Sequence, residues 1–506
     1  MKDIEFLLLL LLAAMLLVRG AELVRVPYPV MLVVGGLAIG LVPGAPDVEL
    51  EPEVVFLIFL PPLLHAAGWY SSPRELWAEV RPLAVLAVGL VLATMAAVAV
   101  VAHAVVPGMS WEAAFVLGAI VGPTDPVSAQ ATFSRLGAPA RMRMLVEGES
   151  MINDATALVA FRVALVALTE GAFSLGDALV EFVTSAAGGA LVGLAVGWLF
   201  TQVIRRQSNT ALSILLSVLT AYTGYIVAEE AGVSGVLGAV FSGLYSGWYA
   251  HTALDAGTRL SAVAFWQVMV LGLEGMLFIL LGLQAPQVAE EVHVAPLVAQ
   301  ALLVGLVVIA VRMAFALVPA ARFGDTWRER VVVGWAGMRG AISLAAALAV
   351  PLEVDERPEI LLITFLVILV TLLGQGLTLA PLLRWLRLQG EERWSPDEAT
   401  ARLETAQAAL DRLEELEDEG AAGEPVRRLR ELYRGRFALC VAILGGGDLP
   451  EDGRPELKEY GAMRRELLAA ERAALLGLRN DGKIRGDMVR KIERDLDLDE
   501  ARIRPE

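Results

Sequence analysis

The sequence predicts an all-α polytopic membrane protein with about thirteen transmembrane helices and a helical cytoplasmic tail. Long apolar runs recur until about residue 390, and 56% of the residues are hydrophobic, with a mean hydropathy of +0.62. Most of these runs are apolar on every side, as bilayer-spanning helices are. Two runs are interrupted by Gly and Pro, and the chain beyond 390 is highly charged. We therefore divide the chain into a membrane domain, 1–389, and a cytoplasmic domain, 390–506.

The apolar runs locate the expected helices to within a few residues. The first run follows an acidic start and has no small-residue cleavage site after it. We expect it to be retained as the first helix and not removed as a signal peptide. In order, the expected helices cover about 4–19, 27–43, 53–69, 82–106, 112–133, 140–169, 176–204, 209–230, 233–249, 259–285, 294–321, 329–351 and 359–387.

Loop charges test this helix count independently, because cytoplasmic loops carry an excess of Lys and Arg. Acids dominate the loops after even-numbered helices, where Arg357 is the exception. A wrong count would disrupt the alternation, which predicts an N-terminus outside the cell membrane and a cytoplasmic C-terminus. The loops after odd-numbered helices and the end of the last helix carry Arg19, Arg25, Arg74, Arg81, Arg135, Arg141, Arg143, Arg205, Arg206, Arg259, Arg322, Arg328, Arg330, Arg384 and Arg387.

The fifth and twelfth expected helices are both interrupted. Gly122-Pro-Thr-Asp-Pro126 breaks the fifth, since neither proline has the N–H that closes a helical hydrogen bond. Gly337-Met-Arg-Gly340 weakens the twelfth near its middle. Interrupted helices at corresponding places in two halves point to the inverted repeats of a transporter and to its binding site. We predict two inverted six-helix repeats joined by the seventh helix.

The tail is predicted to form charged helices over about 402–419, 425–444, 456–479 and 484–500, with a regulatory or dimer-stabilising role. It contains no recognisable nucleotide-binding loop, metal cluster or catalytic triad. We therefore expect neither an enzyme nor a cofactor. The net charge of −16 argues against nucleic-acid binding. The single Cys440 excludes an intramolecular disulfide.

Asp154 is the first candidate for an ion-binding residue. It lies in the sixth expected helix beside Asn153, with Ser150 one turn earlier on a shared face. Ionisable groups at membrane depth are costly and usually line an ion or proton path. A carboxylate can hold a cation or a proton but not both, which is the basis of exchange. The alternative is a protonated Asp154 that only joins helices.

Asp125 is the second candidate, in the gap of the fifth helix. There it can neutralise the positive N-terminal ends of half-helices, or it can ligate the transported ion. The neighbouring Thr124 offers a hydroxyl and a freed carbonyl to a cation. At this stage both interpretations of Asp125 stand.

Other charged residues also lie inside expected helices. We predict that Glu149 and Arg339 form a buried ion pair, since an unpaired guanidinium at the break would be expensive. Glu274 is a possible funnel or gate residue, and so is His65, for which a packed polar role is the alternative. Arg162 and Arg312 need partners that the sequence does not identify.

The chain resembles the cation:proton antiporter-1 family, which includes bacterial NhaP-type Na⁺/H⁺ antiporters and the eukaryotic sodium/proton exchangers. The segments that carry the resemblance occur in order over most of the membrane domain, and together they are highly specific. They are Leu60-Pro-Pro-Leu-Leu64, Pro123-Thr-Asp-Pro-Val127, Glu147-Gly-Glu-Ser-Met-Ile-Asn-Asp-Ala155, Phe278-Ile-Leu-Leu-Gly-Leu-Gln284 and Gly334-Trp-Ala-Gly-Met-Arg-Gly-Ala-Ile-Ser-Leu344.

The resemblance implies a thirteen-helix homodimer with a six-helix core and a dimerisation domain. It implies that Asp154 exchanges cation and proton with Asn153 as its support, and that Na⁺ binds at Asp154, Ser150 and Thr124. It further implies Asp125 at the helix crossing and a Glu149–Arg339 pair. The Asn-Asp sequence is similar to electroneutral members. One departure is that many relatives carry an aromatic residue and then Glu where this chain has His65 and Ala66.

We therefore expect a secondary antiporter of the cell membrane that exchanges Na⁺, and Li⁺ as well, for protons by alternating access. Its partners are the monovalent cation, the proton, membrane lipid and a second copy of the chain. Three alternatives remain open from the sequence: a K⁺/H⁺ antiporter, a gated cation channel and a proton-coupled solute symporter. Cation selectivity depends on cavity geometry that the sequence does not provide.

Overall fold

The structure is a computed structural model of the 506-residue chain, and its regular elements are helices throughout the described part. That part comprises residues 2–24, 26–42, 52–170, 175–290, 294–317, 326–388, 390 and 396–444, with 463, 466–475, 492 and 496 in the tail. Its contacts divide the chain into two units, Met1–Glu391 and Glu392–Glu506.

By their contacts, we group the helices of the first unit into two bundles. The first, which we call the scaffold bundle, is held together by close pairs such as α10 with α12 and α12 with α3. Small residues permit this proximity: a Cβ on Gly193 would collide with the backbone of Gly238 on the facing helix. The scaffold bundle contains α1 (Lys2–Val24), α2 (Tyr28–Gly40), α3 (Pro52–Tyr70), α10 (Leu175–Ile204), α11 (Thr210–Glu230), α12 (Gly235–Ala253) and α13 (Ala256–Glu290).

The second bundle, which we call the site bundle, packs α7 against α6 and α9, and α14 against α15 and α17. In it α5, the π-helical turn η1 and α6 continue one another along the chain. The site bundle contains α4 (Pro73–Ala78), α5 (Val80–Ala84), η1 (Val85–Leu90), α6 (Val91–Val105), α7 (Trp111–Ile120), α8 (Val127–Leu136), α9 (Ala140–Glu170), α14 (Val294–Leu317), α15 (Trp327–Trp335), α16 (Ala341–Leu348) and α17 (Arg357–Trp385).

Both predicted interruptions are present. The fifth expected helix is divided into α7, which ends at Ile120, and α8, which begins at Val127. The twelfth is divided into α15, which ends at Trp335, and α16, which begins at Ala341. The prolines explain the first break, because each removes a helical hydrogen bond.

Seven described helices are long and apolar enough to cross a membrane, and three shorter apolar helices accompany them. The shorter ones cover Tyr28–Gly40, Leu57–Tyr70 and Trp111–Ile120. The prediction of an all-α membrane protein is therefore confirmed. The count of thirteen spans and the inverted repeats remain predictions.

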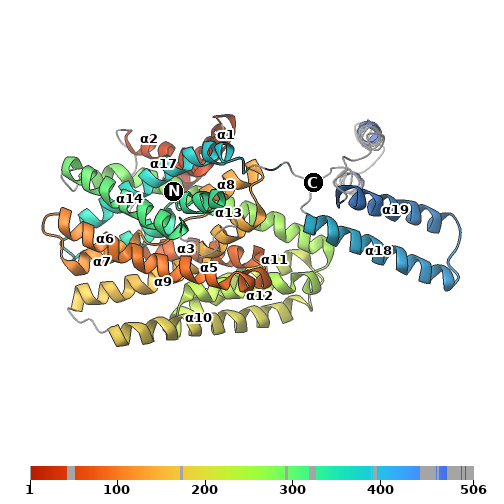
Figure 1. The fold of residues 1–506 in the computed structure, drawn as a ribbon, viewed down its shortest axis with the longest axis horizontal. Coiled ribbons are helices and arrows are strands. Elements are labelled where there is room, and N and C mark those ends of the chain that lie inside the picture. The colour runs from red at the N-terminus through yellow and green to blue at the C-terminus, as the bar shows by residue number, and fades with distance from the viewer. Residues whose placement is uncertain are drawn as a thin grey trace. The chain divides into compact units, whose positions relative to one another are not determined.

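The second unit contains a helical hairpin formed by α18 (Pro396–Asp418) and α19 (Glu424–Leu444) (Figure 1). Gly420 and Gly423 in the turn have positive φ angles of 107° and 97°, which glycine adopts without a steric penalty. Arg430 of α19 forms an ion pair with Glu417 of α18. The helices predicted for 456–479 and 484–500 lie largely outside the described residues.

Candidate ion-binding site

The two interrupted segments cross one another. The N–H of Asp125 donates to the carbonyl of Met338 over 2.8 Å, and the Arg339 guanidinium donates to the carbonyl of Gly122. The N–H of Arg339 donates to Oγ1 of Thr371 on α17 over 3.1 Å. Backbone groups that a continuous helix would pair internally are thus satisfied across the crossing, which makes two helix breaks tolerable at membrane depth.

Asp125 lies at the start of two half-helices. Its Oδ1 accepts the N–H of Val127, the first residue of α8, over 2.9 Å. Its carboxylate also packs against Gly340, which directly precedes α16. The N-terminal ends of both half-helices carry partial positive charge, so the carboxylate stabilises both. This geometry supports the structural interpretation of Asp125, although the side chain also lines the cavity described below.

We expect Gly340→Ala to damage both stability and transport. A Cβ at this position would overlap the Asp125 carboxylate and lie 2.6 Å from the Asp125 Cβ, so the aspartate would have to leave its place at the crossing. Overpacking of this kind costs about 1–3 kcal/mol. Thermal unfolding in detergent and proton flux in proteoliposomes should both decline. Gly374→Ala in α17 is the matched control, since a Cβ there meets nothing within 4 Å. Equal behaviour of the two variants would contradict the prediction.

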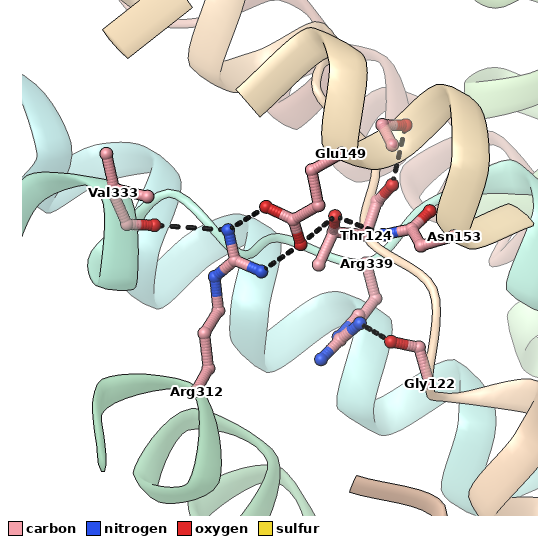
Figure 2. Close-up of polar contacts among 8 residues, drawn as sticks. Gly122, Thr124, Glu149, Asn153, Arg312, Val333 and Arg339 are labelled. Atoms are coloured by element: carbon pink, nitrogen blue, oxygen red, sulfur yellow. Dashed lines mark hydrogen bonds and ion pairs between the residues drawn. The ribbon is translucent and has the colours of Figure 1, made fainter. Parts of the chain in front are cut away.

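Hydrogen bonds hold the first break against α9 (Figure 2). Ser150 Oγ donates to the carbonyl of Thr124 over 2.9 Å, and Asn153 Nδ2 donates to Thr124 Oγ1 over 2.9 Å. The Thr124 hydroxyl in turn donates to Glu149 Oε1 over 3.2 Å. The structure therefore brings together Thr124, Ser150 and Asn153 as expected. Asn153 Oδ1 is buried and accepts no hydrogen bond from the described residues.

The predicted pair of Glu149 with Arg339 is wrong. Glu149 pairs with Arg312 of α14, whose Nη2 donates to Glu149 Oε2 over 2.8 Å while Nη1 binds Oε1 (Figure 2). Arg312 Nη2 also donates to the carbonyl of Val333 over 3.1 Å. Arg339 instead satisfies the opened backbone at Gly122. The reason is tertiary, because α14 packs against α15 and places its arginine beside α9.

Asp154 faces a cavity of about 350 Å³ that also reaches the helix crossing. The residue is 4% exposed. Four acids line the cavity, and no Lys, Arg or His is among its described lining residues; these acids are Asp125, Glu147, Asp154 and Glu274. Ser150 and Ser343 add hydroxyl groups to the wall. A concave site whose described charged residues are all acids concentrates cations and disfavours anions.

The remaining candidates divide between the cavity and the core. Glu274 lines the cavity and accepts a hydrogen bond from the Tyr28 hydroxyl over 2.7 Å. Glu147, also in the wall, accepts from Gln130 Nε2 over 3.2 Å. His65 is buried: its Nδ1 lies 2.9 Å from Ser242 Oγ, and its ring stacks on Trp266. His65 is not among the described lining residues, so the packed polar interpretation fits it better than a gate.

Sequence reasoning missed three contributors to the site: Arg312, Tyr28 and Gln130. For Arg312 the signal was present, since an arginine inside an apolar run requires a buried partner. Tyr28 and Gln130 gave no signal, because a tyrosine or glutamine at a helix end is ordinary in sequence. Ala66 lines the cavity as well, so the position where many relatives carry Glu contributes an apolar wall here.

Two interrupted helices that cross beside a buried carboxylate, at the end of an acid-lined cavity, define an ion-coupled secondary transporter. The family profile described as "Sodium/hydrogen exchanger, transmembrane" matches residues 7–385. The chain belongs to this family. Its members are named as sodium/hydrogen exchangers, which are transporters.

The chain is similar to individual relatives over most of its length. It is 35% identical to an uncharacterized Na⁺/H⁺ exchanger of Mycobacterium tuberculosis over 507 residues, 95% of this chain and 92% of that relative. It is 32% identical to the Na⁺/H⁺ antiporter ApNhaP of Aphanothece halophytica over 379 residues, covering 72% and 71% of the two chains. The fold matches the sodium proton antiporter MjNhaP1 of Methanocaldococcus jannaschii with a TM-score of 0.62 at 21% identity, covering 77% and 99%.

Proposed function

We propose that this protein exchanges Na⁺ or Li⁺ for protons across the cell membrane, and that Asp154 holds the cation and the proton in turn. The observation that carries the proposal is the position of Asp154 on a cavity whose charged lining residues, among those described, are all acids. Oxygen ligands suit hard cations, and Thr124 and Ser150 line the same cavity as Asp154, with Asn153 hydrogen-bonded to Thr124. Membership of the sodium/hydrogen exchanger family supports the same activity.

The proposed cycle uses the competition at one carboxylate. A deprotonated Asp154 takes a cation from the cavity and carries it as the site bundle moves against the scaffold bundle. Protonation on the other side displaces the cation, and the neutral acid returns. In this cycle the Glu149–Arg312 ion pair and the hydrogen bond from Arg339 to the Gly122 carbonyl keep the ligand positions fixed.

The proposal includes the finer features that the sequence predicts. We place the N-terminus outside and the C-terminal unit in the cytoplasm, with thirteen spans in two inverted repeats. We also place two copies of the chain in a homodimer that keeps the scaffold bundles still. The alternation of basic loops supports the orientation, and the two interrupted helices support the repeats.

We expect a bell-shaped dependence of exchange on pH, because protons block cation binding at low pH and become scarce at high pH. Raising Na⁺ should move the acidic limb to lower pH, since the cation then competes better for the same carboxylate. Proton flux in proteoliposomes with a pH-sensitive dye, measured with Na⁺, Li⁺, K⁺ and Rb⁺ on one preparation, tests this. If the acidic limb of the pH profile did not move with Na⁺ concentration, Na⁺ and protons would not compete for the same site.

The ion panel also separates the alternatives. Flux with K⁺ equal to or above that with Na⁺ would make the chain a K⁺/H⁺ antiporter.

We further expect one cation to be exchanged per proton. A membrane potential imposed with potassium and valinomycin should therefore leave the initial rate of exchange unchanged. A rate that follows the imposed potential would refute electroneutral exchange. Unitary currents in a planar bilayer would instead indicate a channel.

A further inference from the structure

A second cavity of about 210 Å³ flanks α9 on the far side of Asp154. Glu147, Ser150 and Asp154 face the first cavity, whereas Leu158 and Arg162 face the second. These residues follow one another at spacings of three or four along one stripe of α9. The proposed carboxylate therefore lies between two cavities, one toward each end of the same helix. We call the second one the far cavity.

An apolar cluster separates the two cavities. Met151 in this cluster lines the first cavity, and Val236 lines the far cavity. Leu158, one turn beyond Asp154, packs against the cluster. The cluster joins α3 and α12 of the scaffold bundle to α9 of the site bundle and contains Leu60, Leu64, Met151, Ala155, Val236, Leu237, Ala239 and Val240. The first cavity thus reaches Asp154 while apolar side chains close the route from the far cavity.

An ion pair in the far cavity connects the two bundles. Arg162 Nη2 on α9 donates to both carboxylate oxygens of Glu229 on α11, over 2.8 and 2.7 Å. Glu229 Oε1 also accepts the N–H of Gly235, the first residue of α12, over 3.1 Å. The pair therefore links the helix that carries Asp154 to the end of α11 and the start of α12.

The exposure of this pair suits a contact that must break. The Arg162 and Glu229 side chains are 45% and 31% exposed, whereas those of Arg312 and Glu149 are 1% and 0% exposed. Pairs in contact with water contribute little net stability and separate easily, while removing one partner of a buried pair leaves an uncompensated charge. Of these two pairs, only the exposed one can open in each cycle at small cost.

We infer that the far cavity is the second access route for the cation and that the Arg162–Glu229 pair is its gate. When the bundles separate at this end, Arg162 leaves Glu229, and that carboxylate then receives the monovalent cation in place of the guanidinium. This inference rests on the proposed exchange, which requires Asp154 to open to the far cavity at one stage of the cycle.

A reversible cross-link tests the gate. In a Cys440→Ser background, Arg162→Cys and Glu229→Cys are joined by a bifunctional methanethiosulfonate reagent in proteoliposomes. We expect exchange to fall at least tenfold and to recover when the link is reduced. Na⁺ should still raise the thermal stability of the linked protein, because the first cavity reaches Asp154. Exchange that continues at full cross-linking would overturn the gate.

The matched control is the cross-link of Glu79→Cys with Arg141→Cys. The native pair is also partly exposed, with a 2.7 Å contact, but both residues lie in the site bundle. Linking them should leave exchange unchanged, since no contact between bundles is fixed. Equal inhibition by both links would also overturn the inference, because it would show a general effect of cross-linking.

A second measurement leaves the native pair intact. Leu158→Cys places a thiol in the wall of the far cavity. A membrane-impermeant thiol reagent added on that side should label it faster during Na⁺-driven turnover than without Na⁺. Equal labelling in both conditions would overturn the proposal. Failure of the proposed function itself would look different: the parent chain would show neither exchange nor stabilisation by Na⁺.

Discussion

Asp154→Asn is expected to reduce Na⁺-driven proton movement to the level of protein-free liposomes, a loss of at least a hundredfold. The amide keeps the size and much of the polarity of the side chain but cannot release or take up a proton. The coupling step is therefore lost, while the fold around the cavity is retained. The measurement is dye-reported proton flux in proteoliposomes, normalised to the amount of folded protein.

The control for this variant is Glu112→Gln, which neutralises an exposed acid in the first turn of α7, outside the cavity lining. Its flux should match that of the parent chain. Sodium-driven proton movement that survives in Asp154→Asn would remove Asp154 from its proposed role and would return attention to the other acids of the cavity.

Arg312→Gln is expected to destabilise the protein by about 3–5 kcal/mol, the typical cost of leaving one partner of a buried ion pair uncompensated. The Glu149 carboxylate, 0% exposed, would lose both of its bonds to the guanidinium. It would keep the hydrogen bond from the Thr124 hydroxyl. A lower midpoint of thermal unfolding in detergent, with less folded protein recovered, is the result to measure.

Two further variants decide whether the effect is that of a buried pair. Arg141→Gln breaks a partly exposed pair with Glu79, whose side chains are 31% and 22% exposed, and should cost less than about 1 kcal/mol. The double variant Glu149→Gln with Arg312→Met should recover part of the lost stability, because neither charge of this pair is then left buried without the other. A double variant less stable than Arg312→Gln would contradict this account.

The interrupted helices, and the choice of Asp154 as the candidate carboxylate, follow from the sequence for specific reasons. Pro123 and Pro126 cannot close helical hydrogen bonds, which favours a break between them, whereas Pro61 and Pro62 lie inside the continuous α3. Asp154 is a candidate because a carboxylate at membrane depth is energetically costly and usually has a function. These inferences need only the covalent structure of the chain and the cost of placing polar groups in a membrane.

The partner of Glu149 illustrates what such reasoning misses. Both Arg312 and Arg339 lie in apolar runs, so from the sequence either could be the buried arginine that pairs with Glu149. The choice depends on the packing of α14 beside α15, which brings Arg312 to Glu149 and leaves Arg339 to the carbonyl of Gly122. His65 follows the same pattern, since its burial against Ser242 and Trp266 depends on how α3 meets α12 and α13.

The hydropathy, the breaks and the acid at membrane depth all follow from local chemistry, which each residue carries into any fold. The pairing of the buried arginine, the shared cavity of four acids and the far cavity beyond Asp154 depend on helices distant in the chain. Composition and spacing therefore indicated the class of protein and the carboxylate that we propose for the site. Only the packing of the two bundles decided which charges meet, because distances between separate helices are set by side-chain fit across their interfaces.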